Sequence, residues 1–135
     1  MAEKIIAYLR RTAQEQAQQY RGTLDPYIIR HLYDVTRILA AAPEILTKAG
    51  GIFWPIVERD RIQFGRQFPA FGENPASVLQ ESLAMMRRGG AANGLLERNY
   101  NERVIPLVWS ARPLFSEILA GFTQAAEHCL AFNVP

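Results

Sequence analysis

The chain has 135 residues, which is the size of a single domain, and its 49% hydrophobic and 21% charged residues are ordinary for a globular protein. Its net charge of +2, from 15 basic and 13 acidic residues, is too balanced to indicate a nucleic-acid-binding protein by itself. A single cysteine excludes an internal disulfide and a cysteine-based zinc site, and the lack of a long apolar run predicts that no helix spans a membrane.

A first helix is predicted over residues 2–20, because apolar residues recur there at intervals of three or four, at Ile5, Ile6, Leu9, Ala13, Ala17 and Tyr20. The segment Arg21-Gly22-Thr23 is expected to end this helix, with Gly22 as the C-cap. The short apolar run at the N-terminus is interrupted by charged residues, unlike a secretory signal peptide, so we expect a cytoplasmic protein.

A second helix is predicted to begin at Asp25-Pro26, where Asp can act as the N-cap and Pro suits the first helical position. Its apolar stripe predicts that it runs to about Ala41. A short helical turn is then expected from Pro43, ended by Gly50-Gly51.

Residues 52–71 hold five of the fourteen aromatic side chains of the chain. Pro55 suits the start of a further helix, and a strand over 52–57 is disfavoured because proline cannot donate a ladder hydrogen bond. A loop is expected over 69–74.

The pair Asn74-Pro75 repeats the pattern that starts a helix, and Gly89-Gly90 is placed to end that helix after two arginines. A further helical run follows Asn93-Gly94, and Pro106 is expected to kink or break it near Ile105. Three apolar residues after that proline are expected to return to the core: Leu107, Val108 and Trp109.

The last predicted helix, over residues 112–132, has the most continuous apolar face in the chain, and the other helices are expected to pack against it. Helix boundaries recur along the sequence without any strand pattern. The sequence therefore predicts an all-α fold, a compact bundle of about five to seven helices that forms a single domain over residues 1–135.

No recognisable catalytic motif or cofactor-binding motif is present in the sequence. His31 and Asp34 share a helical face, but the Glu-x-x-His spacing of a bundle metal site is absent, so no metal site is predicted. Cys129 follows His128, yet adjacent residues on a helix do not face each other, and Cys129 lies on the apolar stripe. We expect a buried thiol rather than a nucleophile.

A polar, arginine-rich region could bind nucleic acid or another phosphate-bearing partner. The loop over 87–94 combines two arginines with glycines that can expose backbone N–H groups, although the same glycines suit a helix C-cap. The candidate nucleic-acid-binding residues are Arg87, Arg88, Arg98 and Arg103. Acidic neighbours dilute the positive charge, so this function is an alternative and not the leading hypothesis.

The leading hypothesis is a protein-binding surface within residues 52–71, because arginines interleaved with aromatic residues are typical of interface cores. The candidate interface residues are Trp54, Arg59, Arg61, Phe64, Phe68 and Phe71. We expect Phe53 and Phe64 inside the fold and part of Trp54, Phe68 and Phe71 at a partner surface.

Three functions are therefore compatible with the sequence. The first is a small interaction protein that forms a homo-oligomer or serves as a subunit or adaptor of a larger assembly. The second is a nucleic-acid-binding accessory protein, and the third is an enzyme or small-ligand-binding protein with a pocket between helices.

Overall fold

The last helix, α7 (Phe115–Ala131), is the centre of the fold. In the computed structural model, which describes residues 1–20 and 22–135, it packs against α1 (Ala2–Gln16), α2 (Arg30–Ala41), α3 (Ile45–Phe64) and α5 (Pro75–Arg88). The side chains that α7 buries recur every three or four residues along one face of the helix: Phe115, Ile118, Phe122, Ala125, Ala126, Cys129 and Leu130. Its first turn is closed by Glu117, whose Oε2 atom accepts a hydrogen bond from the Leu114 N–H at 2.6 Å.

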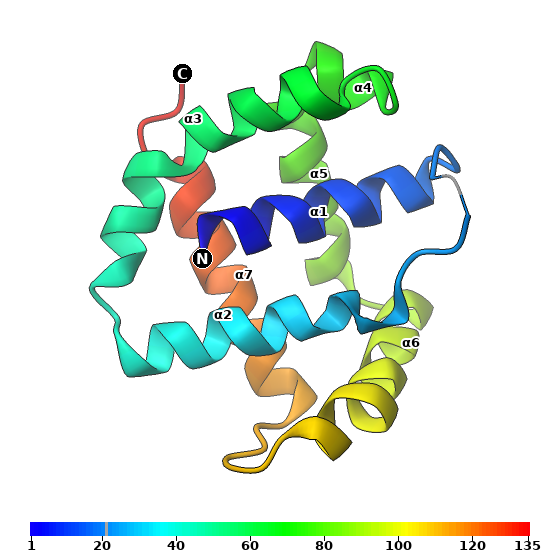
Figure 1. Ribbon diagram of the computed structural model, residues 1–135, viewed down its shortest axis with the longest axis vertical. Helices are drawn as coiled ribbons and strands as arrows, with labels where there is room; N and C mark the ends of the chain where they lie inside the picture. Colours follow the sequence, from blue (N-terminus) through cyan, green and yellow to red (C-terminus); the bar gives the residue numbers. More distant parts are fainter. Residues whose placement is uncertain (21) are drawn as a thin grey trace.

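Figure 1 shows α1 crossing over α5, and α2 crossing over α7, in a compact arrangement of helices. The chain is 78% helical with seven α-helices in its described part, and no strand is found there. This helical content is far above the roughly one-third that is usual for soluble proteins. The predicted all-α, single-domain fold is therefore confirmed.

Two helix starts follow the predicted cap-and-proline pattern. The Asp25 side chain accepts a hydrogen bond from the Tyr27 N–H at 2.9 Å, which begins the 3₁₀ turn η1 (Pro26–Ile29) that leads directly into α2. The Asn74 side chain accepts a bond from the Ser77 N–H at 3.0 Å at the start of α5. After α5 ends at Arg88, Gly89 and Gly90 both adopt positive φ angles, as expected for residues that close a helix.

The predicted helix end at Gly50-Gly51 is wrong, because α3 continues through both glycines and through Pro55 to Phe64. Gly50 is needed for packing, since a Cβ atom there would lie 2.7 Å from Cγ of Phe132. Pro55 has no N–H to donate to the carbonyl oxygen of Gly51, four residues earlier. Both residues are exposed, so water can bond that carbonyl instead. Figure 1 shows α3 bending part way along its length, as an interior proline favours.

Other boundaries also differ from the predicted ones. Helix α1 ends at Gln16 rather than near Tyr20, because the chain turns at Gln18, which has a φ of 56°. Arg21, which belongs to the predicted end of this helix, lies outside the described residues. The expected loop over 69–74 contains the short helix α4 (Pro69–Glu73).

The predicted break before Pro106 is present as a change of helix type. Helix α6 (Ala91–Asn99) gives way to the π-helical turn η2 (Tyr100–Val104) and then to the 3₁₀ turn η3 (Ile105–Leu107). The backbone nitrogen of Pro106 carries no hydrogen and cannot donate an α-helical hydrogen bond, so the chain passes through a wider π turn and a tighter 3₁₀ turn here.

The core lies where α1 and α2 meet α7, and the ring of Tyr8 packs edge-on against that of Phe122 with centroids 5.1 Å apart. Burial raises the pKa of the Tyr8 hydroxyl, which finds no hydrogen-bond partner among the described residues. In the described part of the chain, none of the helices combines the length and hydrophobicity needed to cross a lipid bilayer.

Candidate functional site

A polar cavity of about 530 Å³ opens between α1, the turn that follows it and the end of α3; we call it the arginine pocket. Its lining includes three arginines and three glutamines: Arg10, Arg11, Arg66, Gln14, Gln19 and Gln67. The rest of the lining consists of the aromatic residues Tyr20 and Phe64 and of Ala7. No carboxylate lines the cavity among residues 1–20 and 22–135, so its charge is positive.

Arg10 is the most unusual side chain of the arginine pocket, because only 8% of its side chain is exposed. Its guanidinium lies over the Phe64 ring, with Cζ 3.6 Å from the ring centroid, and its Nε atom is 3.7 Å from Oδ2 of Asp60. That distance is an ion pair but too long for a hydrogen bond, and the Nε–H is without a partner among the described residues. Burial lowers the pKa of Arg10, and the Asp60 charge acts in the opposite direction.

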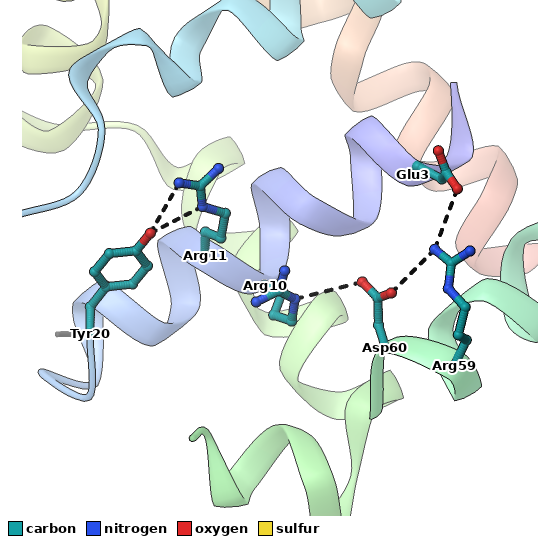
Figure 2. A network of polar contacts seen from close by, with 6 residues as sticks. All are labelled: Glu3, Arg10, Arg11, Tyr20, Arg59 and Asp60. Carbon is teal, nitrogen blue, oxygen red and sulfur yellow. Dashed lines mark hydrogen bonds and ion pairs between the residues drawn. The ribbon is translucent and has the colours of Figure 1, made fainter. Parts of the chain in front are cut away.

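The residues around Arg10 are fixed by further polar contacts, which Figure 2 shows. Arg59 reaches from α3 to Asp60 at 3.5 Å and to Glu3 of α1 at 3.3 Å. On the other side of α1, Arg11 donates hydrogen bonds from Nε and Nη2 to the Tyr20 hydroxyl oxygen, at 3.2 and 3.0 Å. Ion pairs therefore join α1 and α3 on one flank of the pocket. On the other flank, the hydrogen bonds to Tyr20 connect the turn after α1 to that helix.

Sequence reasoning missed the arginine pocket, although one signal was present. Arg10 and Gln14 follow Ile6 at intervals of four, so they continue a buried row of α1 with polar side chains. Both are indeed buried, and Gln14 donates a hydrogen bond to the Gln19 carbonyl oxygen at 3.1 Å. The ion partner Asp60 lies fifty positions away, so only the fold brings the pair together.

The predicted interface residues of 52–71 are mostly engaged within the chain. Phe68 and Phe71, expected to be partly exposed, are buried with 3% and 0% exposure, so these two are core residues. Phe68 precedes α4 and Phe71 lies within it, and their rings stack with centroids 6.3 Å apart. Phe53 is buried as expected, whereas Phe64 and Trp54 are half-buried.

The two arginines of that predicted interface also have partners in the chain. Arg59 joins Glu3 and Asp60, as described above. Arg61 binds Glu58 through two hydrogen bonds of 2.8 and 2.6 Å, which lower the pKa of the Glu58 carboxyl. What remains exposed and apolar on α3 is a pair of isoleucines, Ile52 and Ile62.

The four candidate nucleic-acid-binding arginines do not form one free cluster. Arg87 pairs with Glu127 of α7, and Arg88 pairs with Glu81 at 2.8 Å. Arg103 lies over the ring of Tyr27 in η1, 5.7 Å from its centroid, and Arg98 is exposed on α6. The paired carboxylates offset two of the four positive charges.

A second candidate surface lies after η3, in the segment of residues 107–114, which we call the Trp109 segment. Leu107, Val108 and Trp109 were expected in the core, but only Val108 is buried. Trp109 is 99% exposed, and Leu107 and Leu114 are 60% and 68% exposed. The expectation fails because the turns η2 and η3 direct only one side chain of this short run inward.

The histidines and the cysteine are packed as structural groups. Burial raises the pKa of the Cys129 thiol to about 11, so it stays protonated at neutral pH. The His128 ring packs on Phe132 with centroids 5.5 Å apart. Asp34 is bound to Lys4 at 2.8 Å, and burial lowers the pKa of His31. In the described part of the chain, no three His, Cys, Asp or Glu side chains lie together as metal ligands would.

Comparison of the chain with protein-family models, with curated proteins and with solved structures finds no match.

Proposed function

We propose that this protein is a small helical interaction protein, which self-associates through the Trp109 segment. The exposure of Trp109 is the observation that carries this proposal. A fully exposed indole contributes nothing to the fold, whereas tryptophan is enriched among the residues that dominate binding energy at interfaces. Two further large apolar side chains in the same eight residues, Leu107 and Leu114, add to the apolar surface left in water.

The backbone of the Trp109 segment is held in place, which supports a binding role over a loose loop. Val108 is anchored in the core, and its carbonyl oxygen accepts a hydrogen bond from Arg112 Nε at 3.1 Å. The Tyr100 hydroxyl donates a hydrogen bond to the Pro113 carbonyl oxygen. A segment that is already ordered loses less conformational entropy when it binds, so more of the gain from apolar burial is retained.

A second copy of the chain is the partner that we favour, because a projecting side chain and a hollow lie together. Beside Trp109 there is a cavity of about 200 Å³, which is lined by Leu107, Val104, Tyr33 and Arg30 among others. In a two-fold symmetric dimer each copy would present both features, so each indole could enter the hollow of the other copy. The Arg30 guanidinium could then lie over the indole face.

We place the interface at residues 107–114 and not at residues 52–71, because the aromatic side chains of residues 52–71 are largely buried. A cytoplasmic location belongs to the same proposal, and a lone cysteine is compatible with a reducing compartment. Nucleic-acid binding through Arg87, Arg88, Arg98 and Arg103 is the weaker alternative, since two of these arginines already have carboxylate partners.

Light scattering after size-exclusion chromatography at micromolar concentration tests the proposal. We expect a dimer for the wild-type chain and a monomer for Trp109→Ser, with unchanged circular dichroism because the side chain is outside the fold. Ile62→Ser is the matched control, since Ile62 is also a strongly exposed apolar residue but lies on α3. The proposal is wrong if the wild type is monomeric, or if Ile62→Ser dissociates the dimer and Trp109→Ser does not.

A further inference from the structure

We propose that the arginine pocket binds a small molecule that carries a phosphate monoester group. This inference is independent of self-association, because none of the residues that line the arginine pocket belongs to the Trp109 segment. Figure 2 shows the arrangement from which it starts: Arg10 points from α1 toward Asp60 of α3, while Arg11 points toward Tyr20.

The charge of the arginine pocket matches that of a phosphate monoester. Three arginines line it, and Asp60 beside Arg10 offsets one of them, so three positive charges less one negative charge leave +2. A phosphate monoester carries about −1.5 to −2 at pH 7. A monocarboxylate would leave about half of the positive charge uncompensated.

Arg10 supplies the strongest structural reason for a ligand. Its side chain is more than nine-tenths buried, yet it makes no hydrogen bond with any described residue, and Asp60 is its one ion partner in the described chain. Burying a cation with so few partners is costly unless another group satisfies it. Because Arg10 lines the pocket, oxygen atoms of a bound phosphate could accept bonds from its Nη groups.

The other two arginines of the pocket are less buried than Arg10 and differ in how they are constrained. Arg11 is oriented by its two hydrogen bonds to Tyr20 and therefore has a defined direction before a ligand arrives. Arg66 is exposed and makes no ion pair with another described residue. A phosphate between them would contact one preorganised guanidinium and one that is free to move onto it.

The size and remaining lining of the pocket indicate an ester rather than inorganic phosphate. A volume of about 530 Å³ lies within the range of roughly 300–1,000 Å³ that is typical of small-molecule sites. The side-chain amides of Gln19 and Gln67 can bond hydroxyl or ring nitrogen atoms of the group that the phosphate is attached to. The Phe64 ring packs against the Arg10 guanidinium and so helps to hold it in the wall of the pocket.

Isothermal titration calorimetry of the full chain at low salt tests this inference. The probes are ribose 5-phosphate and adenosine monophosphate, with inorganic phosphate, succinate and an oligonucleotide without terminal phosphates as comparisons. We expect saturable binding of at least one of the two esters, tighter than that of every comparison probe. Arg11→Met and Arg66→Met should each weaken this binding about tenfold or more, because each removes a charged hydrogen-bond donor.

Arg37→Met is the matched control, since Arg37 is an exposed arginine on α2 that does not line the arginine pocket. We expect this variant to bind as the wild type does. The inference is overturned if neither ester binds, or if Arg11→Met and Arg66→Met bind as Arg37→Met does. Tighter binding of succinate would instead assign a dicarboxylate, and tighter binding of the oligonucleotide would assign nucleic acid; both results would contradict the phosphate monoester.

Discussion

Gly50 of α3 lies directly against the Phe132 ring near the C-terminus, so that a Cβ atom at residue 50 would be only 2.7 Å from Cγ of Phe132. The next residue, Gly51, has no such neighbour within 4 Å. Two adjacent glycines in one helix therefore have different reasons for being there, and substitution by alanine separates them.

We predict opposite effects of alanine at the two positions. Gly50→Ala should lower the free energy of unfolding by about 1–2 kcal/mol, because the overpacked methyl group must displace the Phe132 ring. Gly51→Ala should raise it by roughly 0.5–1 kcal/mol, since alanine favours the helix and meets open space. Urea denaturation of both variants measures the difference, and equal effects would show that the close approach to Phe132 is absent.

The start of α5 provides a second prediction. Asn74→Ala should cost about 1 kcal/mol of stability, because the Ser77 N–H loses the side-chain oxygen that it donates to. Ser77→Ala is the control, since only the backbone of Ser77 takes part in this bond, and we expect a change of less than about 0.5 kcal/mol. A loss of stability in Ser77→Ala as large as that in Asn74→Ala would contradict the capping role.

Local signals of this kind were sufficient to predict several helix starts and the all-α class. Asp25-Pro26 and Asn74-Pro75 act through atoms two or three residues away, so their effect can be read from the sequence. The path of α3 could not be predicted, because Gly50 is required by a side chain 82 positions further along the chain. The burial of Phe68 and Phe71 likewise depends on which elements cover them, and a count of aromatic residues does not reveal it.

The candidate sites depend even more on tertiary structure. Arg10 and Asp60 come from different helices, and nothing local marks them as a pair. Trp109 was expected in the core because hydrophobicity alone does not show which side of an irregular segment faces inward. Its exposure follows from the turns before it and from the hydrogen bonds that Tyr100 and Arg112 make to the segment.

The buried acids predict how stability changes at alkaline pH. Burial raises the pKa of Cys129 to about 11 from its ordinary value of 9.0, and it also raises the pKa of Tyr8. A group with a raised folded-state pKa stabilises the protein below its unfolded pKa, and this contribution is lost as the pH rises further. We therefore expect the urea concentration at which half of the protein is unfolded to decrease as the pH is raised from 9 to 11.

Cys129→Ala isolates the share of the thiol in that loss. Between pH 9 and pH 11 the free energy of unfolding of the variant should fall by on the order of 1 kcal/mol less than that of the wild type, because alanine has no thiol to ionise. Reaction with a thiol reagent at pH 8 gives an independent reading, since the wild type should react only when urea is added. A fast reaction of the native protein would mean that Cys129 is accessible and that the assigned burial is wrong.

The environment of Trp109 in solution tests self-association most directly. The chain has two tryptophans, so Trp54→Phe leaves Trp109 as the only one, and it removes an indole N–H that is buried without a partner among the described residues. The fluorescence of this variant is then followed over dilution from micromolar to nanomolar concentration. We predict a shift to longer wavelength as the dimer dissociates and the Trp109 indole returns to water. Emission typical of a fully hydrated indole at every concentration would contradict the proposed interface.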